Sequence, residues 1–161
     1  MPEDSSDLKL LVQRSELVSV SFFEMSARKF DEAQVTAGAD TDDFEIAPIY
    51  SLQTASRDDD TGFRVRIKVE VELPAGSLVV DAAAEYVVSE ISAKAIDPDL
   101  LVDFVNEVSA MAMFPYLRQA VADMSQRIFG MSLLLPLLQR GQLVFQIIQP
   151  DEAVALRRAA V

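Results

Sequence analysis

The sequence predicts an α+β fold, in which a four-stranded antiparallel sheet with a long crossover is followed by a long helix and a shorter C-terminal helix. Residues 63–73 (FRVRIKVEVEL) alternate apolar odd positions with charged even positions, as a strand does when one face lies in the core and one in water. From Leu117 to Ile128, apolar residues recur at steps of four, three and four, which forms one face of a helix. Strand patterns precede helix patterns, so we expect a single domain over residues 1–161.

The composition argues against several functional classes. A net charge of −12 and a pI near 4.3 repel phosphate backbones and anionic lipids, so we expect neither nucleic acid nor a membrane surface as a partner. The chain contains no cysteine and no histidine, which excludes disulfides and removes the commonest general base and metal ligand. We therefore expect no enzyme activity, cofactor or metal, although a site made only of carboxylates stays open.

The ends and the apolar runs indicate where the protein works. No apolar run approaches the ~20 residues that span a bilayer. The first nine residues, MPEDSSDLK, are acidic and polar, unlike a signal peptide. We therefore expect a cytoplasmic protein whose acidic charge would keep exposed apolar surface soluble.

The first strand is predicted over residues 8–23, after a flexible acidic tail at residues 1–7. Apolar residues recur there with a period of two, but Arg14 and Glu16 interrupt the pattern, which indicates a bend, a bulge or an exposed patch. Residues 26–43 lose the alternation and gather Gly, Thr and Asp, as expected of a crossover loop.

Three further strands complete the predicted sheet. Residues 44–52 (FEIAPIYSL) are expected at a sheet edge or beside a bulge, because Pro48 lacks the amide that a strand ladder needs. Residues 57–62 (RDDDTG) are predicted to form a solvated hairpin tip, since no Glu or backbone pattern completes a calcium loop around the three aspartates. After the alternating third strand, residues 78–89 run back with apolar even positions.

Two helices are predicted next. Asp97 caps a short helix that has Pro98 in its first turn. This helix is expected to end before Phe114, because Pro115 donates no backbone hydrogen bond and pushes the preceding residue toward an extended conformation. The long helix is therefore predicted to begin at Pro115 and to end at Gly130, a residue suited to a left-handed cap.

The C-terminal part leaves alternatives open. Residues 131–138 (MSLLLPLL) form the most apolar window of the chain, and Pro136 prevents one regular helix. This window is either a buried connector or an exposed, oligomer-facing loop. Residues 142–149 fit a strand or a helix, and we favour a final helix from about Gly141, followed by a tail at residues 150–161.

Residues 106–127 (NEVSAMAMFPYLRQAVADMSQR) carry the motif F-P-Y-x-R after a short apolar run. This stretch resembles the long helix of the SecB-type protein-export chaperones, and the motif is uncommon outside that family. Residues 12–23 are similar to the family's first strand, and residues 63–89 are similar to its central hairpin. The resemblance covers most of residues 8–148, and the family shares the predicted layout of sheet, long helix, connecting loop and second helix.

The resemblance implies an ATP-independent holdase. Family members are cytosolic homotetramers, built as dimers of dimers, that hold unfolded proteins in long apolar grooves, and many deliver preproteins to the SecA motor. By position, the resemblance implies a client-binding groove formed by Ile46, Tyr50, Leu52, Met111, Met113, Leu133, Leu135, Leu137, Leu143 and Phe145. It implies an oligomer interface that uses Phe114, Tyr116, Leu117, Val121 and Met124 of the long helix.

The sequence leaves several alternatives for the partner protein of this chain. The family's first strand carries acids that help to receive SecA, in the form D-I-S-F-E, whereas residues 19–23 here are SVSFF and both acids are absent. The remaining acidic, partner-binding face is expected at Asp81, Glu85, Glu70 and Glu72. Some divergent members instead chaperone the antitoxin of a toxin–antitoxin pair. The alternative from another class is a dedicated interaction domain whose apolar loop is buried by one partner.

Overall fold

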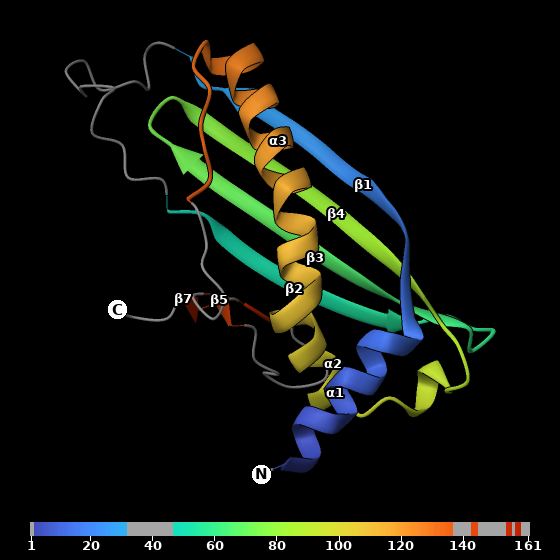
Figure 1. Ribbon diagram of the computed structural model, residues 1–161. Helices are drawn as coiled ribbons and strands as arrows, with labels where there is room; N and C mark the ends of the chain where they lie inside the picture. The colour runs from blue at the N-terminus through green and yellow to red at the C-terminus, as the bar shows by residue number, and fades with distance from the viewer. Residues whose placement is uncertain (1, 32–46, 137–142, 145–153, 156, 159–161) are drawn as a thin grey trace.

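The computed structural model describes residues 2–31, 47–136, 143–144, 154–155 and 157–158. A twisted antiparallel sheet forms one layer, and helix α3 (Ala110–Phe129) lies diagonally across one of its faces (Figure 1). Helices α1 (Pro2–Arg14) and α2 (Pro98–Phe104) contact each other at one end of the sheet. Four long strands followed by a long helix confirm the predicted α+β fold.

The strands of the main sheet lie in the order β1-β4-β3-β2-β6, and every neighbouring pair is antiparallel. Their bounds are Ser15–Lys29 (β1), Ile49–Ser56 (β2), Gly62–Leu73 (β3), Gly76–Val88 (β4) and Val154–Ala155 (β6). The odd positions of β3 and the even positions of β4 are buried, apart from the half-buried Leu73, which confirms the predicted alternation. We call this side of the sheet, under α3, the covered face, and the opposite side the open face.

The hairpin between β2 and β3 turns where the sequence predicted it. The Arg57 amide donates to the Gly62 carbonyl at 2.8 Å, and Asp60 adopts a left-handed conformation with φ of 63°. Strand β2 begins directly after Pro48, because proline cannot donate to the ladder. The segment of this predicted strand before residue 47 lies outside the described residues.

Helix α1 corrects the prediction for the N-terminal segment. Residues 2–7, predicted as a flexible tail, and residues 8–14, predicted as the start of a strand, form one helix. The period of two was misleading, because Leu8 and Leu11 are also three apart, and it is Leu11 that is buried in the core. The Ser15 hydroxyl donates to the Leu11 carbonyl at 2.6 Å, where the helix passes into β1.

Strand β1 is longer and more irregular than an ideal strand. It pairs with β4 as far as Lys29, so residues 26–29 are strand rather than the predicted loop, and most of the predicted crossover lies outside the described residues. Register shifts between Leu17 and Ser19 and between Phe22 and Glu24 leave an extra residue at each point, as a β-bulge does. The expected irregularity is therefore present, but at Val18 and Phe23 rather than at Arg14, which ends α1, and Glu16.

The predicted break before Pro115 is absent. Helix α2, a π-helical turn η3 (Val105–Ser109) and α3 follow one another without interruption, and Pro115 lies inside α3. Proline forfeits one backbone hydrogen bond there, but Phe114 and Leu117 on either side are buried against the sheet. Tertiary packing thus outweighs the local preference.

The continuous helix has two further properties. By length and composition alone, residues Pro98–Phe129 could cross a membrane, a test that the core helix of a soluble protein also passes. Here 39% of its most apolar window is buried inside the protein. The helix ends at Gly130, whose φ of 74° confirms the predicted left-handed cap.

The predicted C-terminal helix is not seen in the described residues of that region. Leu143–Val144 (β5) pairs with Arg157–Arg158 (β7), and β6 extends the main sheet beside β2. The remaining residues of the predicted helix lie outside the described ones. The apolar pattern of residues 142–149 fitted both structures, and the described residues Leu143–Val144 are extended because they pair with β7.

Candidate functional site

Most of the predicted client-binding residues that the structure describes lie in the first half of β2, in the first turn of α3 and in the segment that follows α3. Tyr50 and Leu52 of β2 are buried, and the Tyr50 ring packs on Phe114 with 5.5 Å between centroids. Met113 is fully buried, whereas Met111 is exposed. Three predicted residues, Ile46, Leu137 and Phe145, lie outside the described ones, and Leu143 lies in β5.

The leucine-rich segment after α3 is held against that helix. The Leu133 amide donates to the Ser125 hydroxyl at 2.8 Å, and the Arg118 guanidinium donates to the Leu135 carbonyl at 3.1 Å. Leu133 and Leu135 are buried, whereas Leu134 between them is 62% exposed. The described part of the segment, residues 131–136, is therefore a connector that buries Leu133 and Leu135. Ser132 and Leu134 are exposed, as the alternation of an extended chain could have indicated.

The predicted oligomer interface divides in two. Phe114, Leu117, Val121 and Met124 are buried within the chain itself, under the helix. Tyr116 is 47% exposed on the other side of α3. The sequence could not separate these groups, because an apolar stripe does not say which of its edges meets the sheet.

Several exposed apolar side chains lie instead along β1, and sequence reasoning missed most of them. The exposed large apolar residues of the sheet and of α3 are Leu17, Val18, Phe22, Phe23, Met25, Ile49, Met111, Tyr116 and Ile128. Five of these nine belong to β1, an edge strand that pairs only with β4 among the described strands. An exposed apolar edge strand favours association with another chain.

The predicted acidic face is compensated by cations of β3. Asp81 is 5% exposed, and both of its carboxylate oxygens accept hydrogen bonds from Arg66, at 2.8 and 2.7 Å. These hydrogen bonds raise the pKa of the Arg66 guanidinium. Two further acids of the face are paired as well, Glu85 with Arg64 and Glu70 with Lys68, whereas Glu72 is exposed.

Phe23 covers these ion pairs. Its ring lies 4.2 Å from the guanidinium carbon of Arg66 and 5.1 Å from that of Arg64. Phe23 stands at the second irregularity of β1, which turns it toward the open face. The register pairs Arg64 directly with Glu85, so that ion pair could have been found from the hairpin pattern. The diagonal contact of Arg66 with Asp81 and the cover by Phe23 could not.

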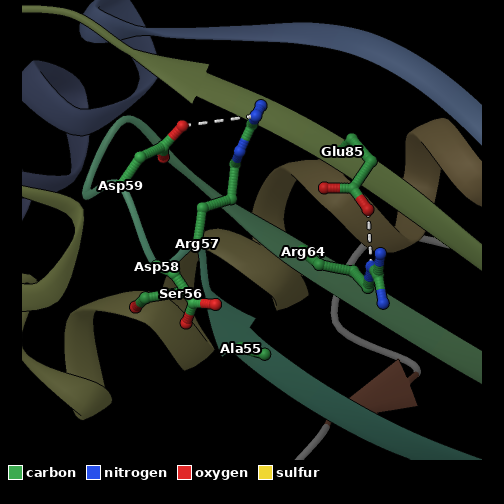
Figure 2. A pocket seen from close by; sticks show the side chains of 7 residues that line it. All are labelled: Ala55, Ser56, Arg57, Asp58, Asp59, Arg64 and Glu85. Atoms are coloured by element: carbon green, nitrogen blue, oxygen red, sulfur yellow. Dashed lines mark hydrogen bonds and ion pairs between the residues drawn. The ribbon is translucent and has the colours of Figure 1, made fainter.

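A cavity of about 400 Å³ lies at the hairpin end of the open face. It is lined by Ala55, Ser56, Arg57, Asp58, Asp59, Arg64 and Glu85. Figure 2 shows that two cations project into this region and that each is held by a carboxylate, Arg57 by Asp59 and Arg64 by Glu85. The cavity therefore suits polar groups rather than a large apolar ligand.

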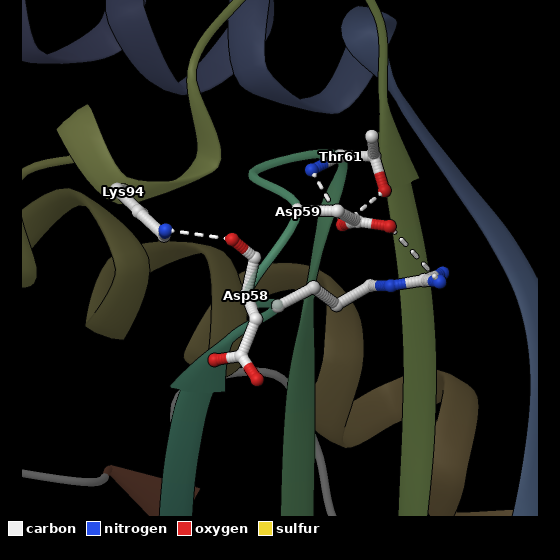
Figure 3. A network of polar contacts seen from close by, with 5 residues as sticks. Asp58, Asp59, Thr61 and Lys94 are labelled. Atoms are coloured by element: carbon white, nitrogen blue, oxygen red, sulfur yellow. Dashed lines mark hydrogen bonds and ion pairs between the residues drawn. The ribbon is translucent and has the colours of Figure 1, made fainter.

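Two of the three aspartates at the hairpin tip, Asp59 and Asp60, hold it through their carboxylates. Asp59 accepts from the amide and the hydroxyl of Thr61, and these hydrogen bonds lower its pKa (Figure 3). Asp60 accepts from the Ser92 hydroxyl and the Lys94 amide, which lowers its pKa as well. The Lys94 ammonium donates to the Asp58 backbone carbonyl at 2.7 Å. Among the described residues, no group of three potential ligands could hold a metal ion.

Comparisons with known proteins give two informative similarities, and no protein-family model matches the chain. The chain is 33% identical to the SecB-like chaperone SmegB of Mycolicibacterium smegmatis over 135 residues, which cover 84% of this chain and 83% of that protein. The fold is similar to that of a SecB-like chaperone of Mycobacterium tuberculosis, solved in complex with a ChAD peptide from the HigA1 antitoxin. That comparison has a TM-score of 0.61 and 15% identity, and it covers 86% of this chain and all of the other.

Proposed function

Because the chain belongs to the SecB-like chaperone family, we propose that it is an ATP-independent cytoplasmic chaperone that holds unfolded polypeptides and prevents their aggregation. The observation that carries this proposal is the 33% identity to a SecB-like chaperone along 84% of the chain. The exposed apolar side chains in a chain of net charge −12 support it. Holding a client requires only apolar contact area, at about 25 cal/mol per Å², and neither a nucleotide nor a catalytic group.

The proposed client-binding surface lies where β2, α3 and residues 131–135 meet. Met111 and Leu134 are already exposed there. Tyr50 and Leu52 are buried, and the Tyr50 ring packs on Phe114, so a client would reach them only by displacing the side chains that cover them. A pliable thioether at Met111 would accept varied client side chains.

We propose an antitoxin segment as the client, in preference to a handover to SecA. The neighbour from Mycobacterium tuberculosis was solved with an antitoxin peptide. A charge-driven dock for a basic SecA segment would need free acids on the open face, and three of the four predicted acids are already paired with cations of β3. Binding to a SecA segment would therefore be weak and sensitive to salt.

The proposed assembly is a homotetramer built as a dimer of dimers. It would bury the exposed apolar residues of β1 and of α3, including Phe22, Met25 and Tyr116. Size-exclusion chromatography with light scattering tests this assembly. A stable monomer at micromolar concentration would contradict it.

Light scattering of a refolding client tests the chaperone function. We expect the full chain, without nucleotide, to suppress aggregation of a urea-unfolded client at a few-fold molar excess. Leu134→Ser should weaken suppression, because Leu134 is exposed beside the proposed surface. Leu10→Ser is the matched control, since Leu10 is also exposed but lies on α1. Absence of suppression by the unmodified chain would refute the holdase.

Capture from a native lysate separates the holdase from a dedicated interaction domain. A general holdase should retain many proteins, each in small amount. Capture of one dominant protein in stoichiometric amount would favour the dedicated interaction domain. If that protein were an antitoxin, the chain would still be a chaperone, with the antitoxin as its client. Titration with a synthetic antitoxin segment and with the C-terminal segment of SecA then identifies the partner.

A further inference from the structure

The connector, residues 131–136, runs back along the helix that precedes it (Figure 1). Its contacts follow α3 in reverse order, because Leu133 meets Ser125 and Leu135 meets Arg118, two helical turns earlier. Residues 132–136 belong to neither a helix nor a strand. Among the described residues, the attachment of the connector therefore depends on side chains of α3 and on its own buried leucines.

Ser125 uses both the proton and the oxygen of its hydroxyl to join the connector to α3. It donates to the Ala122 carbonyl at 3.1 Å and accepts from the Leu133 amide at 2.8 Å. Ser125 is fully buried, so an apolar residue in its place would leave the buried Leu133 amide without this acceptor. Ser132 adds a third contact, because its hydroxyl also donates to the Ala122 carbonyl, at 3.3 Å.

Arg118, the last residue of the motif F-P-Y-x-R, holds the other end of the connector. Its guanidinium Nε donates to the Leu135 carbonyl at 3.1 Å. Two other residues of the motif, Phe114 and Leu117, are buried, so the arginine is the part of the motif that reaches the connector. A hydrogen bond from a charged donor is roughly twice as strong as one between neutral groups. We therefore expect Arg118 to contribute more to this attachment than Ser125.

The attached connector conceals apolar side chains. Leu133 and Leu135 are 8% and 1% exposed, whereas Leu134 between them is 62% exposed. Movement of the connector away from α3 would bring both buried leucines into solvent beside Leu134. A segment that is fixed by a few contacts opens more readily than the whole protein unfolds. The connector can thus change the amount of accessible apolar surface while the sheet and α3 stay intact.

We propose that Arg118 and Ser125 are positioning residues that keep the connector closed on α3, and that its opening controls how tightly an unfolded client binds. The closed state conceals Leu133 and Leu135, and the open state offers them to the client. The control of binding rests on the proposed chaperone function, because it requires a client. The two hydrogen bonds that keep the connector closed do not depend on that function.

The expected size of this control follows from the two hydrogen bonds. While the closed state predominates, the apparent affinity for the client is proportional to the fraction of molecules that are open. Loss of a hydrogen bond between neutral groups, as at Ser125, should raise that fraction about fivefold. Loss of the charged donor at Arg118 should raise it about tenfold.

The first experiment measures the opening of the connector without a client. Because the chain has no cysteine, Leu135→Cys introduces a single thiol at a position that is 1% exposed. Its rate of reaction with an aromatic disulfide reagent reports the open fraction. In this background, Arg118→Met should raise the rate about tenfold and Ser125→Ala about fivefold. Arg118→Lys keeps a cationic donor and should restore part of the protection.

Arg127→Met is the matched control for this measurement. Arg127 lies on the same helix, but its guanidinium donates to Asp123 of that helix and is largely exposed, so the variant removes the same charge from α3. Its thiol rate should equal that of the Leu135→Cys background. Equal rates for Arg118→Met and Arg127→Met, or no protection by Arg118→Lys, would overturn the proposal. Urea denaturation of each variant tests for global unfolding, and a fall in stability that matches the rise in thiol rate would overturn it too.

The second experiment measures client binding by chains that lack the introduced thiol. We expect Arg118→Met to bind fluorescent reduced carboxymethylated α-lactalbumin about tenfold more tightly than the unmodified chain. Arg127→Met should bind it with unchanged affinity. Unchanged or weaker binding by Arg118→Met would overturn the control of binding by the connector.

The two experiments distinguish this inference from the chaperone function. If lactalbumin binds to none of the chains but Arg118→Met raises the thiol rate, the holdase proposal fails, while Arg118 is confirmed as a residue that keeps the connector closed. If lactalbumin binds and the thiol rates of Arg118→Met and Ser125→Ala do not differ from that of the control, the chaperone function stands and the positioning role of both residues is refuted.

Discussion

The two faces of the sheet differ although they alternate along the same strands. On the covered face, Val65, Ile67 and Val69 of β3 are fully buried beneath α3. On the open face, their neighbours Arg66 and Lys68 form ion pairs with acids of the same sheet. Stability therefore comes mainly from the covered face, because burying apolar area stabilises the fold by about 25 cal/mol per Å², whereas exposed ion pairs contribute little.

The difference also shows that a row of acids in the sequence does not by itself give an acidic surface. The acids of the open face give no free acidic patch, because the cations that alternate with the core residues of β3 compensate them. A partner meets ion pairs and the exposed ring of Phe23 there, rather than a row of free carboxylates. Mutations on the two faces should separate the contribution of apolar burial to stability from that of the ion pairs.

The largest effect is expected on the covered face. Ile67→Ala removes a fully buried side chain at the centre of β3 and should lower the free energy of unfolding by about 2–5 kcal/mol. Lys68→Ala, the next residue but on the open face, should change it by less than about 0.5 kcal/mol. Urea denaturation of both variants measures the contrast. Similar losses would show that the two faces contribute equally.

The covered face was also the part that the sequence predicted best. In β3 and β4 the alternation places Ile67, Val80 and Tyr86 correctly, because only one register buries every apolar residue. The open face was predicted as free acids. Its ion pairs depend on side-chain geometry between strands, such as the diagonal contact of Arg66 with Asp81, which a pattern of residue types does not contain.

The second prediction concerns that contact. Asp81→Ala leaves Arg66 without its bidentate partner and should lower the free energy of unfolding by about 1–3 kcal/mol. The loss should stay below that of a fully buried pair, because about a third of the Arg66 side chain is exposed.

Two comparisons make this measurement specific. Asp81→Ala/Arg66→Met should lose less stability than Asp81→Ala alone, since no unpaired cation remains. Glu70→Ala, which breaks the more exposed pair with Lys68, should cost about 0–1 kcal/mol. If Asp81→Ala and Glu70→Ala lowered the free energy of unfolding equally, the burial of Asp81 would add nothing to the strength of its ion pair.

The ends of the chain and the candidate site were predicted less well than the sheet. Residues 8–14 fitted a strand and a helix, and contacts made elsewhere by Leu11 decide between them. The apolar window after α3 was correctly recognised as ambiguous. Leu133 and Leu135 face inward because Ser125 and Arg118 hold that segment, an arrangement that needs the folded helix.

The third prediction uses a polar group buried on the covered face. The Tyr86 hydroxyl donates to the Ser109 hydroxyl at 3.0 Å beside the π-helical turn. Tyr86→Phe leaves Ser109 without this donor and should lower the free energy of unfolding by about 1 kcal/mol at neutral pH.

The same residue gives a pH dependence of defined sign. Burial raises the pKa of Tyr86 above its ordinary value of 10.0, although the Ser109 hydrogen bond opposes this. The folded protein therefore holds the proton after unfolded chains have begun to release it, so stability must fall as the pH rises above 10. Urea denaturation between about pH 8 and 11 should show a shallower fall for Tyr86→Phe. An identical fall would show that other groups cause it.

The smallest effect compares two neighbouring phenylalanines on opposite faces. Phe23 is 48% exposed over the open face, and Phe22 is 42% exposed where β1 pairs with Ala82 of the covered face. Phe23→Ser removes the ring above Arg66 and should lower the free energy of unfolding by about 0.5–1 kcal/mol. It also opens the ion pair of Arg66 to ions, so the loss should grow between about 0.05 and 1 M salt.

Phe22→Ser provides the matched control, because it removes a similar exposed area without uncovering an ion pair. Its effect should appear as dissociation of the oligomer in light scattering, if β1 lies in the proposed interface, while the salt dependence of unfolding stays unchanged. An equal salt dependence in both variants would mean that Phe23 does not shield the ion pairs. In that case the ion pairs alone would compensate the acids of the open face. The irregularity of β1 that turns Phe23 outward would then have another role, such as a contact with a partner.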